Sequence, residues 1–205
     1  MRIGLLGGSF NPVHNGHLAI ALEVLSRLEL DRVWFVPAGI PPHKSSEELL
    51  PFTLRCKLIK DAIENFPHFE LIEKDYRPGK KSYTFDLIEY LRSEFPEVEF
   101  NFIIGDDIVP QLMTWYRFSE LLEIVKFVVV SRKNRDNSWE NLDYIDKLIF
   151  LKTDIIEVSS SDIRRKIKNG HNISSMVPQN VWEYFQTGFD DERKINPWRQ
   201  YDKEF

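Results

Sequence analysis

The sequence predicts an α/β fold, a single domain built on one open parallel sheet with helices on both of its faces. Short apolar runs alternate along the chain with longer segments whose apolar residues recur at helical spacing, the pattern of parallel strands joined by crossover helices. Of the 205 residues, 42% are hydrophobic and 29% charged, as is typical of a chain that folds around a core in water. No repeat, low-complexity tract or long linker divides the sequence. We therefore expect one domain over residues 1–188, followed by a charged C-terminal extension over 189–205.

The predicted elements alternate from the first residues onward. The run 2–6 is expected to be a strand because it is apolar and ends at Gly7 and Gly8, and the spacing of 18–28 predicts the first helix. Further strands are expected at 33–36, 69–72, 99–104, 126–131 and 148–151, and further helices at 52–65, 84–93, 118–124, 160–168 and 178–186. The carboxyl ends of such strands meet at one edge of the sheet, where open α/β proteins bind their ligands.

Composition argues against several classes of protein. The formal net charge of −5 argues against a protein that coats nucleic acid. The longest apolar run, 127–130, is too short to span a bilayer, and the amino terminus lacks a secretory cleavage pattern. Cys56 is the single cysteine and can form no internal disulfide, which favours a reducing compartment. We expect a cytoplasmic protein without nucleic-acid or membrane partners, in which Cys56 is a small buried residue and homo-oligomerisation stays open.

The segment G-G-S-F-N-P-V-H-N-G-H over 7–17 lies between the first strand and the first helix. It matches neither the dinucleotide fingerprint G-x-G-x-x-G nor the P-loop. Gly7 and Gly8 allow the backbone close to a ligand, the helix start near Asn15 offers free amides, and His14 and His17 add two donors. This combination predicts a phosphate site. Two alternatives stay open: a capping or core role for each histidine, and a zinc site, for which no acidic or cysteine ligand lies nearby.

Two stretches of the sequence resemble signatures of one superfamily. The spacing G-x-F-x-P-x-H-x-G-H from Gly8 to His17 is similar to the signature of the nucleotidyltransferases that carry the HxGH motif. The stretch from Val158 to Arg164, V-S-S-S-D-I-R, is similar to their second signature, I-S-S-T-x-I-R, with Val158 and Ser161 as mild substitutions. The resemblance implies a Rossmann-like fold and transfer of a nucleotidyl group from a nucleoside triphosphate.

Four shorter motifs resemble the bacterial nicotinate-nucleotide adenylyltransferases within that superfamily. They are Pro41-Pro42-His43-Lys44, Ser82-Tyr83-Thr84, Gly105-x-Asp107 and Trp115-Tyr116. Phosphopantetheine adenylyltransferases usually carry Thr where His14 stands, and glycerol-phosphate cytidylyltransferases are typically shorter and lack the Trp-Tyr pair. The chain departs from the family at Arg132-Lys133-Asn134, where Arg-Pro-Gly is common, and at Asp86-Leu87, where Asp-Thr is common.

The resemblance assigns roles to individual residues. The expected catalytic residues are His14, His17, Lys44 and Arg164. Contacts to ATP are expected from Gly8, Ser9, Phe10, His14, His17, Gly105, Asp107, Ser160, Ser161 and Arg164. Contacts to the pyridine nucleotide are expected from Lys44, Tyr83, Thr84, Trp115 and Tyr116. Magnesium is expected to arrive on the ATP phosphates, without a protein ligand set.

Each role has a simpler structural alternative. Ser160 and Ser161 would serve as helix caps, Trp115 as a core residue, and Lys44 and Arg164 as solvated charges. Asp106 is expected to face solvent, with Asp107 on the adenosine ribose.

The leading hypothesis is an enzyme that moves AMP from ATP to nicotinate mononucleotide, giving nicotinate adenine dinucleotide and pyrophosphate in NAD biosynthesis. Nicotinamide mononucleotide or phosphopantetheine as acceptor are the nearest alternatives. A nucleotide-binding module without turnover and a metal-dependent hydrolase are the alternatives of a different class.

Overall fold

A computed structural model describes residues 1–40, 49–74, 81–132, 142–154 and 158–190. Its strands are β1 (Arg2–Gly8), β2 (Arg32–Pro37), β3 (Phe69–Leu71), β4 (Glu99–Gly105), β5 (Lys126–Arg132) and β6 (Leu148–Thr153). Its helices are α1 (Asn15–Arg27), α2 (Phe52–Ile63), α3 (Thr84–Glu94), α4 (Phe118–Ile124), α5 (Ser160–Lys168) and α6 (Gln179–Asp190), with 3-10 turns η2 (Asp106–Thr114) and η3 (Ile145–Lys147).

The six strands form one sheet in the order β3-β2-β1-β4-β5-β6, and every pair of neighbours is parallel. This is the doubly wound order, in which the chain proceeds outward from β1 in one direction and then outward from β4 in the other. Open α/β sheets bind their ligands in the crevice at such a reversal, and here that position lies between the carboxyl ends of β1 and β4. Gly8 ends β1 and Gly105 ends β4, so the two glycine-containing motifs flank this crevice.

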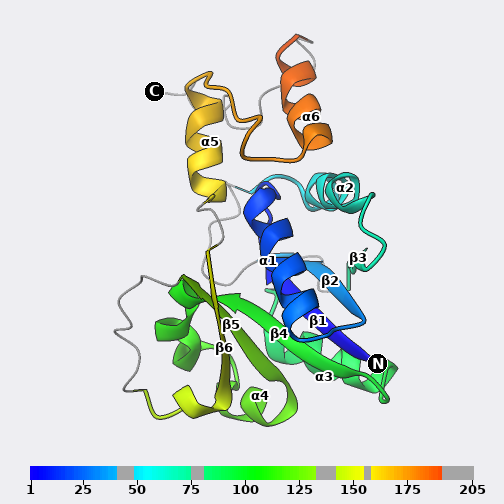
Figure 1. Ribbon diagram of the computed structural model, residues 1–205, viewed down its shortest axis with the longest axis vertical. Helices are drawn as coiled ribbons and strands as arrows, with labels where there is room; N and C mark the ends of the chain where they lie inside the picture. Colours follow the sequence, from blue (N-terminus) through cyan, green and yellow to red (C-terminus); the bar gives the residue numbers. More distant parts are fainter. Residues whose placement is uncertain (41–48, 75–80, 133–141, 155–157, 191–205) are drawn as a thin grey trace.

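Helices cover both faces of the sheet and bury two separate clusters of apolar side chains. Side chains of α1, α2, α5 and α6 belong to one cluster, and side chains of α3, η2 and α4 to the other. In β2 the alternation is visible directly: Val33 and Phe35 join the first cluster, whereas Trp34 and Val36 join the second, as the period of two along a strand requires. Figure 1 shows α3 and α4 at the bottom of the view, α1 and α2 in the middle, and α5 and α6 at the top.

The predicted fold class is confirmed, since each predicted strand and helix is present with differences only at its ends. The turn η2 was not predicted, because it contains Pro110 and follows a 3-10 rather than an α-helical period. Helix α6 runs to Asp190, past the expected boundary at 188, and residues 191–205 lie outside the described residues. Among the described helices, none is both long enough and apolar enough to cross a membrane.

Candidate functional site

The first turn leaves β1 at Gly8 and enters α1 at Asn15 in an unusual backbone conformation. Phe10 has a φ of 45°, in the left-handed region that residues with a Cβ rarely adopt, and its side chain is 1% exposed. Its ring lies 4.8 Å from that of His17 between centroids. The ring of this strained residue therefore packs against one of the two predicted catalytic histidines.

The two histidine rings stack on each other. Their centroids are 3.6 Å apart and their planes differ by 26°, because His14 caps α1 and His17 is in its first turn. The backbone N–H of His14 donates to Nδ1 of His17 at 3.2 Å. Since Nδ1 accepts this bond, the proton of neutral His17 is on Nε2, which makes Nε2 a hydrogen-bond donor.

His14 is held in its neutral form by burial. Its side chain is 6% exposed, and burial lowers its pKa from 6.5 to about 4, because a charged imidazolium loses its hydration there. A Cβ on Gly16 would stand 3.1 Å from Nδ1 of His14 and 3.5 Å from the carbonyl oxygen of Val158. Glycine at this position lets the imidazole, the helix and the chain before α5 pack closely.

The amino terminus of α5 is docked onto the first turn. The hydroxyl of Ser160 donates to the carbonyl of Pro12 at 2.9 Å, and Nη1 of Arg164 donates to the carbonyl of Asn11 at 3.0 Å. Nη2 of Arg164 also donates to the hydroxyl of Ser161 at 3.3 Å. The two signature motifs, far apart in sequence, are thus adjacent in space.

Two details of the helix termini differ from the expectation. The cap of α5 is Ser159, whose hydroxyl accepts from the amide of Asp162 at 3.1 Å, so the alternative in which Ser160 or Ser161 serves as the helix cap is wrong. The amide of Asn15 donates to the carbonyl of Met176 at 2.9 Å, so it is not a free amide. The second contact joins the start of α1 to the chain before α6.

At the carboxyl end of β4, the two aspartates Asp106 and Asp107 differ in exposure, and that of Asp106 differs from the prediction. Asp106 is 5% exposed, whereas Asp107 is exposed, so the expectation that Asp106 faces solvent is wrong. A Cβ on Gly105 would come within 2.4 Å of Oδ1 of Asp107, which shows that the Asp107 carboxylate folds back over the glycine. The exposed carboxylate directly after β4 is therefore that of Asp107.

The residues expected on the pyridine side form an aromatic group. Tyr83 precedes α3, which begins at Thr84, and the rings of Tyr83 and Tyr116 lie 5.0 Å apart. Trp115 packs edge-on against Phe102 of β4 at 6.0 Å and is half-buried. Trp115 therefore takes part in core packing and still keeps an accessible surface.

Arg55 and Ser82 connect the parts of the site. The sequence assigned no role to Arg55, and it named Ser82 only as part of the motif Ser82-Tyr83-Thr84. Arg55 is 1% exposed and donates to backbone carbonyls, among them that of Ser9 in the first turn. The hydroxyl of Ser82 accepts from the amide of Gly39 at 2.9 Å. Arg55 was detectable as an arginine on the apolar face of a predicted helix. Its neighbour Cys56 is buried as expected, and burial raises the pKa of that thiol to about 11.

Several predicted residues lie outside the described residues. They are Pro41, Pro42, His43 and Lys44, which follow β2 in the sequence, Lys133 and Asn134, which follow β5, and the extension beyond Asp190. Among the residues that the structure does describe, no three His, Cys, Asp or Glu side chains gather into a possible metal site.

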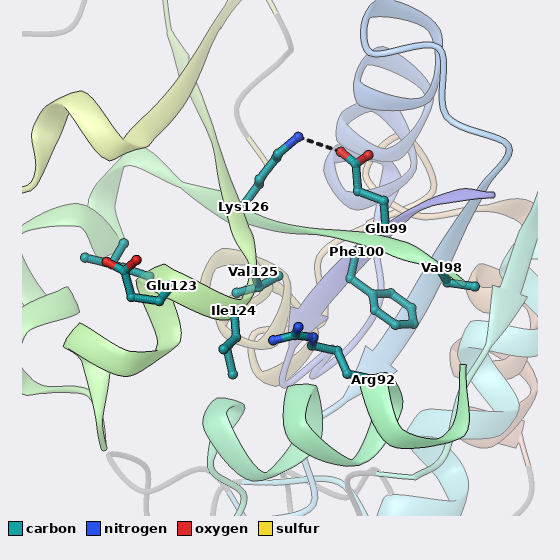
Figure 2. A pocket seen from close by; sticks show the side chains of 9 residues that line it. Arg92, Val98, Glu99, Phe100, Glu123, Ile124, Val125 and Lys126 are labelled. Atoms are coloured by element: carbon teal, nitrogen blue, oxygen red, sulfur yellow. Dashed lines mark hydrogen bonds and ion pairs between the residues drawn. The ribbon is translucent and has the colours of Figure 1, made fainter. Parts of the chain in front are cut away.

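A separate groove of about 280 Å³ lies at the amino ends of the strands. Figure 2 shows its lining, which includes Arg92 of α3 and the ion pair in which Lys126 donates to Glu99 at 2.7 Å. Glu99 and Lys126 are the first residues of β4 and β5. The groove contains none of the candidate residues, and the candidate site is the crevice at the carboxyl ends.

Comparison with known proteins identifies the family of the chain. A family model described as cytidylyltransferase-like matches residues 5–166. The chain is 39% identical over 183 residues to a probable nicotinate-nucleotide adenylyltransferase of Clostridium novyi, covering 86% of this chain and 92% of the relative. It is 36% identical over 185 residues to the nicotinate-nucleotide adenylyltransferase of Bacillus subtilis, covering 90% and 95%. The chain belongs to the nicotinate-nucleotide adenylyltransferases.

A solved structure shares the fold at much lower sequence identity. The nicotinic acid mononucleotide adenylyltransferase of Plasmodium falciparum, complexed with NaAD, matches with a TM-score of 0.75 and 18% identity over 91% of this chain and 95% of its own. This likeness shows that the two chains share a Rossmann-like fold. In the chain described here, the first turn and α5 meet through the hydrogen bonds of Ser160 and Arg164. Both signature motifs named from the sequence lie at that junction.

Proposed function

We propose that the chain transfers the adenylyl group of magnesium-bound ATP to the phosphate of nicotinate mononucleotide. An oxygen of the acceptor phosphate forms a bond to the α-phosphorus of ATP. The bond from that phosphorus to the oxygen bridging to the β-phosphorus breaks, and pyrophosphate leaves with the electron pair. The products are nicotinate adenine dinucleotide and pyrophosphate. The observation that carries this proposal is the docking of α5 on the first turn, with Arg164 bonded to Asn11 beside the stacked pair His14 and His17.

The chemistry needs positioned charge rather than a nucleophile on the protein. The acceptor phosphate is already anionic near neutral pH, so a general base is not required. Two polyanions must instead be aligned while charge moves onto the departing pyrophosphate, and fixed donors supply both functions. Neutral imidazoles, a guanidinium and backbone amides suit this task.

On the ATP side, each donor has a proposed target. Nε2–H of His17 donates to the α-phosphate, and His14 adds a second neutral donor. Arg164, held by Asn11 and Ser161, binds the β- and γ-phosphates. The backbone of Gly8, Ser9 and Phe10 lines the triphosphate, and Lys44 balances charge on the acceptor or ATP phosphate. Ser160, whose hydroxyl is bonded to Pro12, contributes by fixing the turn.

The two organic ends bind at the carboxyl edge of β4. Asp107 accepts hydrogen bonds from the adenosine ribose, above Gly105. Trp115 offers its accessible face to the pyridinium ring, an attraction of about 1 to 2 kcal/mol. Tyr83 and Thr84 present backbone amides at the start of α3 to the nicotinate carboxylate, and Tyr116 closes the other side of the ring.

Magnesium enters as part of the nucleotide substrate. This ion prefers oxygen ligands and is commonly held by substrate phosphates with few protein ligands, which fits a site rich in imidazole and guanidinium donors. Its contribution when bound is to neutralise charge on the phosphates. The fixed donors of the protein then orient the complex.

The test measures magnesium-dependent pyrophosphate release from ATP by the purified chain. Nicotinate mononucleotide, nicotinamide mononucleotide and phosphopantetheine are offered in parallel, and the first is expected to give the highest kcat/KM. Preference for another acceptor would contradict the assignment of the aromatic group but keep the transfer chemistry. Absence of pyrophosphate release with all three acceptors would contradict the proposal as a whole.

A further inference from the structure

Arg55 is a fully buried cation at the base of the candidate site. It lies on the inner face of α2, where Leu58, Ile59 and Ala62 are also buried, and it is 1% exposed. No carboxylate forms an ion pair with it among the residues that the structure describes. A buried charge without a counterion is costly unless dipoles replace its hydration, so its hydrogen bonds identify what this residue does.

Backbone carbonyls take four of the five N–H donors of the guanidinium. Nε donates to Leu50 at 3.0 Å, Nη1 donates to Ser9 and Ala38 at 2.8 Å each, and Nη2 donates to Gly39 at 3.0 Å. These carbonyls come from three separate segments: the turn after β1, the chain after β2 and the chain before α2. One rigid planar group therefore sets the relative positions of all three.

The bond to Ser9 reaches the catalytic side of the crevice. Ser9 precedes Phe10, whose left-handed φ of 45° is unfavourable for a residue with a Cβ and must be imposed by its surroundings. The ring of Phe10 packs against His17, with centroids 4.8 Å apart. Fixing the Ser9 carbonyl thus fixes the residue on which His17 rests.

The bonds to Ala38 and Gly39 lead toward the acceptor side of the site, where we propose that the pyridine nucleotide binds. The amides of Gly39 and Ile40 donate to the hydroxyl of Ser82 at 2.9 and 3.3 Å, and the amide of Ser82 donates back to the carbonyl of Ile40 at 3.0 Å. Ser82 directly precedes Tyr83, at the start of α3. A continuous series of hydrogen bonds therefore runs from the first turn through Arg55 to the proposed pyridine pocket.

We infer that Arg55 is a positioning residue for adenylyl transfer, which aligns the donor turn with the acceptor side without touching either substrate. The inference rests on the proposed role of His17. Lysine cannot replace this arrangement, because its compact ammonium cannot reproduce the planar fork that meets carbonyls of three segments. The charge alone is not what the site requires.

The test compares Arg55→Lys and Arg55→Met with the unchanged chain in the pyrophosphate-release assay. Both substitutions are expected to lower kcat by about 10- to 100-fold, the scale of a misalignment near one ångström. The KM values for ATP and acceptor should stay within about threefold, because the groups that bind each substrate remain. Arg92→Met, at the exposed arginine of α3 in Figure 2, is the matched control and should leave both constants unchanged. Thermal melts establish that each variant is folded, and Arg55→Lys serves if Arg55→Met does not fold.

A double-mutant cycle with His17→Ala separates positioning from general support of the fold. If Arg55 acts through His17, adding Arg55→Lys to His17→Ala should cost less than about threefold further in kcat. Full kcat in a folded Arg55→Lys would overturn the inference, as would a fully additive cycle or a loss confined to KM. A fully active His17→Ala would instead contradict the proposed function, whatever the Arg55 variants show.

Discussion

We call the first turn and the start of α5 the donor side, after the adenylyl donor ATP, and the group of Tyr83, Trp115 and Tyr116 the acceptor side, after the pyridine nucleotide. The two sides are built from different interactions. On the donor side, His14 is 6% exposed and stacked on His17, and Ser160 and Arg164 are hydrogen-bonded to the backbone of the first turn. On the acceptor side, Tyr116 is 49% exposed and contacts its neighbour Tyr83 through ring surfaces. Hydrogen bonds fix directions, whereas ring contacts mainly exclude water and define a slot. The side to which we assign the ATP phosphates thus has fixed donors, and the side to which we assign the planar pyridine ring has a more exposed surface.

The sharpest test of this contrast is His17→Ala on the donor side. Removing a preorganised donor to the α-phosphate is expected to lower kcat by about two to three orders of magnitude. Global stability should change much less, because the side chain is only half-buried. Steady-state kinetics and a thermal melt measure both effects. His171→Ala, at an exposed histidine after α5, is the control, and a fully active folded His17→Ala would remove the donor side from the mechanism.

Burial of His14 makes the stability of the donor side depend on pH. The folded state lowers the pKa of this imidazole from 6.5 to about 4, so between these values the unfolded chain binds a proton that the folded chain does not. The resulting contribution to the free energy of unfolding is fully present above pH 6.5 and is lost as the pH falls toward 4, a change of about 3 kcal/mol.

Urea unfolding at several pH values measures this dependence. Replacing the titrating imidazole in His14→Gln should flatten the curve relative to the unchanged chain, because glutamine has no group that titrates in this range. Parallel curves for the two chains would show that His14 is protonated equally in its folded and unfolded states, which would contradict the burial argument.

On the acceptor side, Trp115→Ala is expected to affect recognition rather than turnover. Loss of the pyridinium contact, worth about 1 to 2 kcal/mol, should raise KM for the pyridine nucleotide by about 5- to 30-fold and leave KM for ATP nearly unchanged. Trp182→Ala, at a half-buried tryptophan of α6, controls for loss of an indole from the core. Equal weakening of both substrates would mean that the edge-on packing of Trp115 on Phe102 is its whole contribution.

The same contrast explains what could be predicted from the sequence. Strands and the longer helices carry strong apolar periodicity, and the two signature motifs have enough defined positions to locate the donor side. The run of serines before α5 offers several equivalent caps, so the choice of Ser159 depends on how the helix docks on Pro12. An arginine in an amphipathic helix is usually exposed, and Arg55 is buried only because carbonyls from distant segments converge on it. The sequence shows neither the docking of α5 on Pro12 nor the convergence of carbonyls on Arg55.

The two aspartates after β4 illustrate the same limit and lead to the smallest predicted effect. Which of them is exposed depends on the turn η2, in which Asp106 is buried and the Asp107 carboxylate lies over Gly105. In Gly105→Ala the new Cβ would stand 2.4 Å from Oδ1 of Asp107, and the carboxylate must move because it is the more flexible partner.

Loss of this carboxylate position should raise KM for ATP by about three- to tenfold, the scale of one ordinary hydrogen bond of about 1 kcal/mol. KM for the acceptor and the thermal midpoint should change little, since only the end of a flexible exposed side chain shifts. Asp107→Ala provides the matched comparison, because it removes the same carboxylate without crowding the glycine. If the proposed ribose contact is correct, adding Gly105→Ala to Asp107→Ala has no further effect on KM for ATP. A further loss in the double variant would mean that Gly105 matters through its own backbone, as close approach to the nucleotide requires, and not through Asp107.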